Sequence, residues 1–454
     1  MRGVAGRWIE RWDPEDETFW NEGGGRRTAL RNLAFSVLSE HIGFSVWSLW
    51  SVMVLFMGPE YHVDPAGKFF LVATPTLVGA VLRVPYTFAV ARFGGRNWTV
   101  VSALMLLAPT IAAAVVLHPG VSYTTLMVVG GLAGVGGGNF ASSMTNINSF
   151  FPLREKGWAL GLNAGGGNIG VAAIQLVGLA VIAGAGAGHP RVVLAIYIPL
   201  IVVAAAASAV FMDNLAPVRN DTGAALAAAR EPHTWIMSVL YVGTFGSFIG
   251  YSFAFGLVLQ NQFGRTPLHA AYLTFIGPLL GSLVRPAGGR LADRFGGARI
   301  SLWIFLAMAA ATAVVLAASQ QRSLGLFLAG FITLFVLTGV GNGSTFKMVP
   351  GIFHRKAEAS GLTGEAAAAW GRRLSGASMG LIGAVGALGG VFINMAFRQS
   401  FLTRHSGTPA FVSFLVYYGL CCVLTWAVYL RRPAGARSAA GQAAQAAPAA
   451  YAEV

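Results

Sequence analysis

Two arginines lie deep inside long apolar segments of the sequence, Arg83 in VLRVPY and Arg285 in LVRPAGG. At about 1.5 Å per residue of helix, each lies roughly 12–14 Å from the charged end of its segment. A charge at that depth costs at least about 2.5–3.5 kcal/mol and usually lines a polar cavity. The ordinary alternative is that each arginine snorkels to the interface or pairs with a buried acid, but acids are scarce in these segments.

The surroundings of the two arginines repeat along the chain. GAVLR at 79–83, followed by RFGG at 92–95, recurs 202 residues later as GSLVR at 281–285 and RFGG at 294–297. In a carrier built from two such repeats, repeat-related side chains face each other near the membrane midplane, where substrate binds. Two opposed guanidinium groups would bind an anion, and their planar forks suit a planar, delocalised oxyanion.

The elements that must position these arginines are membrane-spanning helices. Of the 454 residues 55% are hydrophobic and 11% charged, whereas a soluble domain carries about 25% charged residues. The first 31 residues hold 12 charges and residues 98–153 hold none, which is typical of a chain that crosses a lipid bilayer many times. We predict an all-α membrane protein with twelve spanning helices, at about 31–57, 67–91, 98–117, 122–150, 156–184, 190–212, 232–262, 267–294, 299–319, 324–352, 374–400 and 408–430.

The distribution of basic residues predicts the orientation. With both termini in the cytoplasm, the inner loops, tails and adjoining helix ends carry 22 of the 31 Lys and Arg residues, and the outer side carries 6. This follows the positive-inside rule for a multi-pass protein of the bacterial cytoplasmic membrane. The expected parts are an N-terminal tail (1–30), a six-helix half (31–212), a linker (213–231), a second six-helix half (232–431) and a disordered tail (432–454). An even number of helices in each half makes the two halves parallel repeats.

Other functions are less compatible with the sequence. The net charge of +14 does not indicate nucleic-acid binding, because the basic residues lie between apolar spans rather than on one solvated face. Cys421 and Cys422 are adjacent in an apolar run, which suits neither a disulfide nor a metal site. We find no nucleophile–base set, metal cluster or phosphate loop. We therefore expect no enzyme activity, no metal or cofactor, and a monomer.

Two glycine-rich helices are expected beside the arginines. In the fifth helix, Gly157, Gly161 and Gly165 share one face; in the eleventh, its repeat partner, glycines recur at Gly380, Gly383 and Gly386. Small residues permit close helix packing, and a smooth face would also let one half rock against the other. Asn163 and Asn168 of the fifth helix would add uncharged hydrogen-bond donors.

The end of the eighth helix and the loop after it carry a recognisable motif: Gly281, Arg285, Gly289, Asp293, Arg294, Gly297 and Arg299. Together with two six-helix halves, it resembles the major facilitator superfamily. The copy after the second helix is degenerate, with Thr87 and Ala91 at the Gly and Asp positions. The resemblance implies the major facilitator fold and says little about substrate.

A narrower resemblance rests on the paired glycine-rich segments, the two arginine motifs, NFASSM at 139–144 and YVGTFGSFIG at 241–250. Over residues 30 to 430, the chain is similar to the nitrate/nitrite porter family. The resemblance implies that nitrate or nitrite binds between Arg83 and Arg285. It further implies that Phe140 and Phe245 pack against the anion, Tyr241 and Asn168 donate hydrogen bonds, and Phe44 helps to line the site.

Glu40 lies in the first helix, about nine residues past its start. A buried acid could carry a coupling proton or neutralise an arginine at the cytoplasmic side. We expect the second role, because Glu40 is placed nearer the inner end than the arginine pair. Lys347, in the tenth helix, would either extend the positive cavity or lie near its inner mouth.

The charge count favours one transport mode. Two buried cations without an anion oppose closure of an empty site, and a bound anion offsets part of that repulsion. A carrier that reorients mainly when loaded would exchange nitrate for nitrite. Nitrate–proton symport, with Glu40 or a histidine as proton carrier, is the alternative. An anion-sensing membrane receptor is a third interpretation, which the absence of a recognisable signalling domain disfavours.

Overall fold

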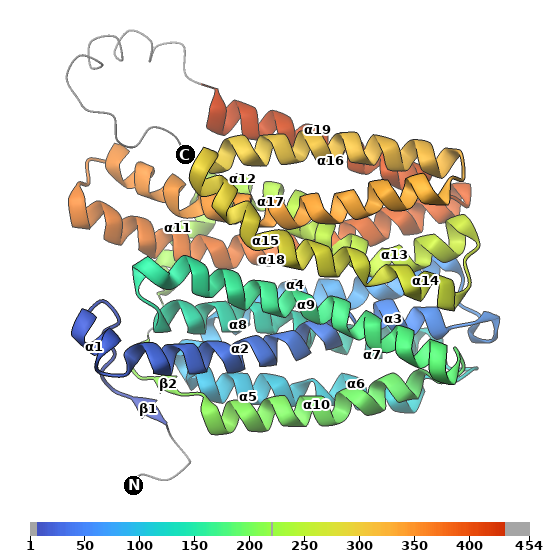
Figure 1. Ribbon diagram of the computed structural model, residues 1–454, viewed down its shortest axis with the longest axis horizontal. Helices are drawn as coiled ribbons and strands as arrows, with labels where there is room; N and C mark the ends of the chain where they lie inside the picture. The colour runs from blue at the N-terminus through green and yellow to red at the C-terminus, as the bar shows by residue number, and fades with distance from the viewer. Residues whose placement is uncertain (1–6, 219–220, 432–454) are drawn as a thin grey trace.

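The computed structural model describes residues 7–218 and 221–431, which form a bundle of twelve membrane-spanning units (Figure 1). In chain order these units are α2 with α3 (Gly25–Trp47, Leu49–Phe56), α4 (Pro65–Phe93), α5 with α6 (Gly95–Met105, Leu107–Val116), α7 with α8 (Tyr123–Leu132, Val135–Phe150), α9 (Leu153–Ala185), α10 (Pro190–Phe211), α12 with the π-helical turn η2 and α13 (Pro232–Tyr241, Val242–Gly246, Ser247–Phe263), α14 with α15 (Pro267–Thr274, Ile276–Phe295), α16 (Gly297–Gln320), α17 (Leu324–Ala359), α18 (Gly364–Arg404) and α19 with the π-helical turn η3 (Thr408–Thr425, Trp426–Leu430). The prediction of twelve helices is confirmed.

Ten of these units, within the described ranges, are long and apolar enough to cross a membrane. The first and fourth units are not among these ten, and their helices break after Trp47 and after Leu132. The Ser48 hydroxyl donates to the Phe44 carbonyl at 2.8 Å, and such a bond from Ser to a carbonyl one turn earlier often bends a helix. Gly134 lies at the second break.

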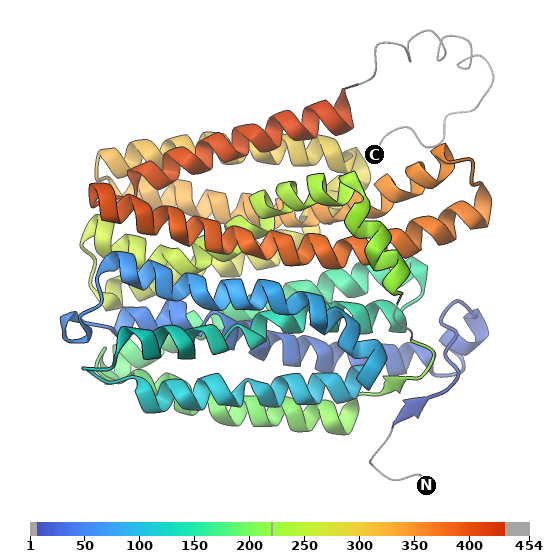
Figure 2. The ribbon, with the colours of Figure 1, turned by 180° about the vertical axis from the view of Figure 1, so that it is seen from behind.

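The units divide into two halves that pack side by side. Figure 1 shows α2–α10 below and α12–α19 above, and Figure 2 shows the same division from behind. The halves contact each other mainly through α4 with α18 and α9 with α15. The N-terminal strand, α11 (Thr222–Arg230) and the described end of the chain lie at one end of the bundle (Figure 1), as an even number of crossings requires.

Far from the termini, at the end we refer to as outer, the two halves are packed tightly. The Phe69 ring of α4 stacks against Phe397 and Phe401 of α18, with centroids 5.4 and 5.3 Å apart. The Gln175 amide of α9 donates to the Ser252 carbonyl of α13 at 2.9 Å. These contacts join the halves in this conformation and close the bundle at its outer end.

The N-terminal segment is more structured than the tail that we expected from its charge. β1 (Trp8–Ile9) pairs in parallel with β2 (Asn214–Leu215), which follows α10, and α1 spans Glu17–Asn21. The indole of Trp12 donates to the Phe150 carbonyl at 3.2 Å. The expectation missed this because the segment's tryptophans, set among charges, pack on the inner loops of the first half.

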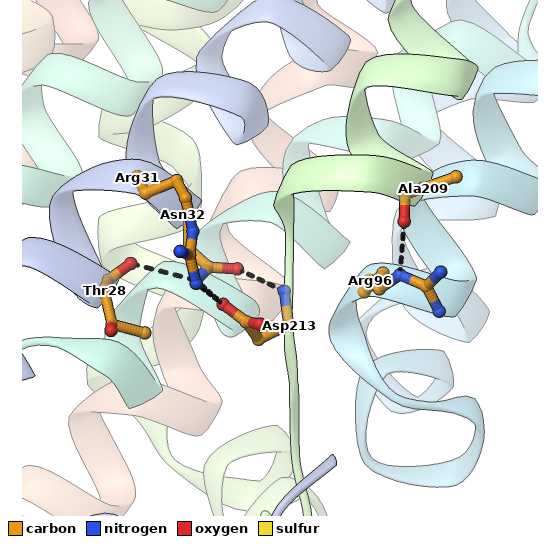
Figure 3. A network of polar contacts seen from close by, with 6 residues as sticks. All are labelled: Thr28, Arg31, Asn32, Arg96, Ala209 and Asp213. Carbon is orange, nitrogen blue, oxygen red and sulfur yellow. Dashed lines mark hydrogen bonds and ion pairs between the residues drawn. The ribbon is translucent and has the colours of Figure 1, made fainter. Parts of the chain in front are cut away.

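An acidic residue after α10 fixes the start of α2 to the beginning of the linker (Figure 3). The Asp213 carboxylate accepts from the Arg31 guanidinium at 2.5 Å and from the Asn32 amide at 2.8 Å. The Asp213 backbone N–H in turn donates to the Asn32 side-chain oxygen at 2.8 Å. The first half thus enters the linker from a fixed position.

Two helix boundaries differ from the prediction. α17 continues to Ala359, and α18 begins at Gly364 rather than near residue 374. Together they form a hairpin that projects beyond the bundle at the end that holds the termini (Figure 1). Charged residues such as Arg372 and Arg373 mark the membrane boundary and not the helix end, since a helix can continue into water. The expected disordered tail, 432–454, lies outside the described residues.

Candidate functional site

Arg83 lies at the centre of the bundle and is fully buried. Its Nε donates to the Gly137 carbonyl of α8 at 3.2 Å, and its Nη1 donates to the Gly383 carbonyl of α18 at 2.7 Å. The second terminal nitrogen, Nη2, is buried with no hydrogen-bond partner in the described chain. Arg83 therefore has two N–H donors, both on Nη2, that no described residue accepts from.

Arg285 of α15 has a matching arrangement in the second half. It is 5% exposed, and its Nη2 donates to the Tyr241 hydroxyl at 3.2 Å. Its Nη1 is buried, and no described residue accepts from it. No ion pair with an acid is recorded for either arginine in the described ranges, yet Arg83 and Arg285 are close enough to interact electrostatically. The repeat thus brings the two guanidinium groups into one region, as predicted.

Aromatic rings surround the Arg83 guanidinium. Its central carbon lies 4.5 Å from the ring centroid of Phe140 and 4.9 Å from that of Phe245. The Trp47 ring, which sequence reasoning did not identify, lies 5.4 Å away. Cation–π attraction to several rings helps to hold a charge in this apolar setting. Phe44 lies in a second layer, 6.1 Å from Phe140 between centroids.

Tyr241 joins the aromatic wall to Arg285. Its ring stacks on Phe245 with centroids 5.2 Å apart and an interplanar angle of 10°. Its hydroxyl is the group that accepts from Arg285. Tyr241 therefore connects the rings beside Arg83 with the second arginine, so a change in its position would affect both halves of the site.

The two asparagines of α9 differ in their surroundings. Asn168 is fully buried, and neither its amide nitrogen nor its oxygen has a partner among the described residues. Asn163 is also buried, but its Nδ2 donates to the Glu40 carboxylate at 2.7 Å and to the Ser143 hydroxyl at 2.8 Å. Both polar atoms of the Asn168 amide are thus unused, whereas in Asn163 the nitrogen is engaged and only the oxygen lacks a partner among the described residues.

The surroundings of Glu40 differ from those that we expected. It is 1% exposed, and its Oε2 accepts hydrogen bonds from Ser143 and Asn163. The charges that act on its carboxyl group belong to Arg83 and Arg285, not to an arginine at the inner end. Counting residues along α2 gave the depth of Glu40 approximately, but not the direction of its side chain.

The glycines of α9 are also distributed differently from the prediction. The helix packs tightly against α2 through another face: a Cβ at Gly167 would lie 2.5 Å from Glu40 Oε1, and one at Gly170 would lie 2.1 Å from the His41 carbonyl. The predicted face, Gly157, Gly161 and Gly165, is turned toward the second half and has room. A Cβ at Gly161 would meet nothing within 4 Å, and one at Gly165 would lie 4.0 Å from the Ser282 carbonyl.

In α18 the three predicted glycines have unequal space. A Cβ at Gly380 would lie 3.7 Å from Thr87 of α4, and one at Gly383 would lie 3.7 Å from Phe140. A Cβ at Gly386 would lie only 2.4 Å from Cδ1 of Tyr241. Gly380 and Gly383 therefore face the first half, while Gly386 leaves room for the tyrosine that contacts Arg285.

Comparison with known proteins identifies the family. The sequence model of the Major Facilitator Superfamily matches residues 35–392. The chain belongs to the major facilitator superfamily. It is 38% identical to the "Nitrate/nitrite transporter NarU" of Salmonella typhimurium, over 93% of this chain and 96% of that protein. It is 30% identical to the "Probable nitrate/nitrite antiporter NarK2" of Thermus thermophilus, over 96% and 99%. Within the superfamily it is a member of the nitrate/nitrite porter family.

A solved structure of the superfamily supports the fold alone. The xylose transporter XylE from Escherichia coli, in a partially occluded inward open conformation, matches 88% of this chain and 98% of its own. The TM-score is 0.67 and the sequence identity 13%. The arrangement of twelve helices is thus that of a major facilitator carrier.

The superfamily motif, which runs from α15 into the start of α16, explains Lys347. Its Nζ forms an ion pair with Asp293 of the motif at 2.9 Å, and both side chains are about half exposed. A Cβ at Gly157 of α9 would lie 4.0 Å from the same Nζ. Lys347 therefore lies at the inner mouth, one of the two positions we expected, and is balanced by an acid.

Proposed function

We propose that this major facilitator protein carries nitrate and nitrite across the bacterial cytoplasmic membrane by alternating access, and that it does so by exchange. The observation that carries the proposal is the pair of buried arginines, Arg83 and Arg285, each with one terminal nitrogen that no described residue accepts from. Proteins named as nitrate/nitrite transporters are similar over nearly the whole chain, which supports this choice of anion.

The free donors would bind the anion. A planar oxyanion between Nη2 of Arg83 and Nη1 of Arg285 would accept charge-assisted hydrogen bonds from both forks. The Asn168 amide, which has no other partner, would add a neutral donor. Phe140 and Phe245, already close to the Arg83 guanidinium, would exclude water and limit the space to a small flat anion.

The charges support exchange even with Glu40 beside the arginines. If Glu40 is ionised, the three groups leave one excess positive charge in an empty site; if it is protonated, they leave two. A monovalent anion lowers this excess in both cases. Because an uncompensated charge in a low-dielectric interior is costly, closure around an anion is favoured over closure around an empty site.

The movement would open and close the two ends in turn. The halves are packed together at the outer end through Phe69, Phe397 and Phe401, so this conformation would take the anion from the inner side. The predicted glycine face of α9 has free space, which closure of the inner end would use. We propose that residues 31–212 and 232–431 move as the two bodies, in a monomer with both ends in the cytoplasm and no enzyme activity.

A counterflow assay in proteoliposomes tests the proposal. Vesicles are loaded with nitrite or with an inert anion, the membrane potential is clamped, and labelled nitrate is added outside. We expect rapid uptake only into nitrite-loaded vesicles, and no requirement for an imposed pH gradient at saturating nitrate. Equal uptake into vesicles without nitrite would contradict exchange, and no uptake under any condition would contradict nitrate transport.

A further inference from the structure

The site holds one buried acid whose role the transport of an anion does not by itself explain. Glu40 is held in place from three sides by neutral groups. Ser143 of α8 and Asn163 of α9 both donate to its Oε2, and Gly167 of α9 leaves the space that its carboxyl group fills. The other carboxyl oxygen, Oε1, is buried and has no hydrogen-bond partner within the described ranges.

The charged groups around Glu40 belong to the anion site. Arg83 of α4 and Arg285 of α15 are the charged side chains that act on its carboxyl group. Its neighbour on α2, His41, directs its ring Nδ1 at the Gly166 carbonyl, 3.2 Å away. From α10, Tyr197 interacts with Ser45 of α2, more than one turn beyond Glu40.

This arrangement places a titratable acid and an anion under the influence of the same two cations. An anion next to a carboxyl group favours its protonated form, because like charges repel. The same interaction acts in reverse, since linkage is reciprocal: protonation of the acid must strengthen anion binding by the same factor. The Oε1 atom of Glu40 is buried and has no hydrogen-bond partner among the described residues, so it can accept the proton.

We propose that Glu40 is the proton-binding group of the anion site, and that binding of nitrate or nitrite between Arg83 and Arg285 is accompanied by uptake of a proton on the Glu40 carboxylate. This inference rests on the proposed function and adds its regulation by pH. The proton leaves solvent and forms an O–H bond on Glu40 when the anion enters, and it returns to solvent when the anion leaves. In an exchange each anion brings its own proton, so exchange needs no pH gradient. With Glu40 protonated, the loaded site holds one positive charge fewer than the empty site, so the preference for closure around an anion applies to the protonated site.

Calorimetry of the purified, full-length protein in detergent tests this directly. Nitrate is titrated at a series of pH values from about 5 to about 9, which covers the range for a buried acid. Each titration is done in two buffers of different ionisation enthalpy, so that the heat reports the number of protons taken up. For the wild type we expect uptake that rises with pH toward one proton per anion and falls again at higher pH, where Glu40 is ionised with and without the anion. Where uptake is largest, the affinity should fall by up to about tenfold per pH unit.

The decisive variant is Glu40→Gln, which keeps the shape of the side chain and removes the titratable group. We expect no anion-linked proton uptake and an affinity independent of pH. The matched control is Glu155→Gln, at the inner end of α9, where the carboxylate accepts from the Trp20 indole at 3.0 Å. This control should bind nitrate and take up protons as the wild type does.

Further variants keep the proposal testable if Glu40→Gln does not fold. Ser143→Ala removes one donor to the carboxylate, which should move the proton uptake to higher pH. Glu40→Asp keeps an acid and should retain uptake with a changed midpoint. Unchanged uptake in Glu40→Gln, an unmoved midpoint in Ser143→Ala, or no uptake in the wild type would overturn the inference. A wild type that binds neither anion at any pH would instead overturn the proposed function.

Discussion

Replacing either central arginine by lysine separates charge from geometry at the proposed anion site. Arg83→Lys and Arg285→Lys keep a positive charge but lose the planar fork. In Arg83 the fork donates to Gly137 and Gly383 and leaves Nη2 free. A lysine ammonium cannot satisfy both carbonyls and the anion from one plane. We therefore expect both variants to fold and to bind nitrate weakly.

The magnitude follows from the loss of one hydrogen bond to a charged group, which contributes about 1.5–3 kcal/mol. Since about 1.4 kcal/mol corresponds to a factor of ten, each substitution should raise the Kd for nitrate roughly 10- to 150-fold. Calorimetry in detergent gives the Kd, and counterflow gives the transport rate. Arg290→Lys, on the exposed side of the same helix as Arg285, is the control and should change neither. A Kd within about threefold of wild type in both central variants would refute the clamp.

Two further predictions concern α9, α18 and the linker. Gly386→Leu should weaken nitrate binding, because its Cβ would displace Tyr241 from Arg285. At Gly161 a larger side chain has room in this conformation, so Gly161→Leu should bind nitrate normally but block counterflow. Full transport by Gly161→Leu would show that the inner end does not close on this face. Asp221 accepts from the Arg373 guanidinium of α18 and from the Ala224 backbone N–H, which lower the pKa of its carboxyl from 3.8 to about 2. A depressed pKa stabilises the folded state above the unfolded pKa, so the docking of α11 on α18 should weaken as pH falls from about 4 toward about 2. Hydrogen exchange of α11, normalised to its intrinsic rate, should rise in that range in the wild type. In Asp221→Asn it should be faster than in the wild type at neutral pH and should not change in that range; wild-type protection of α11 in that variant at neutral pH would contradict this.

The sequence and its family resemblance were sufficient to predict the central pair and its neighbours Phe140, Phe245 and Tyr241, but not Trp47 or the surroundings of Glu40. Arg83 and Arg285 could be found because a repeat relates them and because each breaks an apolar run. Trp47 could not be singled out, since an indole in an apolar helix has many possible neighbours. Glu40 was placed by depth alone, and its position next to the arginines depends on the rotation of α2 against α8 and α9.

The glycines show a similar limit. The run GGG at 165–167 places glycine on several faces of one helix, so the four-residue spacing from Gly157 could not select the face that packs. The structure assigns close packing to Gly167 and Gly170, against α2, and leaves the predicted face open toward the second half. Pattern alone predicted that α9 has a smooth face, whereas the identity of that face depends on tertiary packing.

The partners of Arg83 show how a buried cation can be held by neutral groups and stay available for the anion that we propose. A carboxylate partner would satisfy the guanidinium but would also cancel its charge and compete with nitrate. The carbonyls of Gly137 and Gly383 satisfy two of its donors as neutral acceptors, using lone pairs that a helical carbonyl has to spare. At Gly383 the glycine-rich helix therefore presents a carbonyl to the cation. Glu40, which accepts hydrogen bonds from Ser143 and Asn163, is the acid whose protonation would adjust the charge of the proposed site.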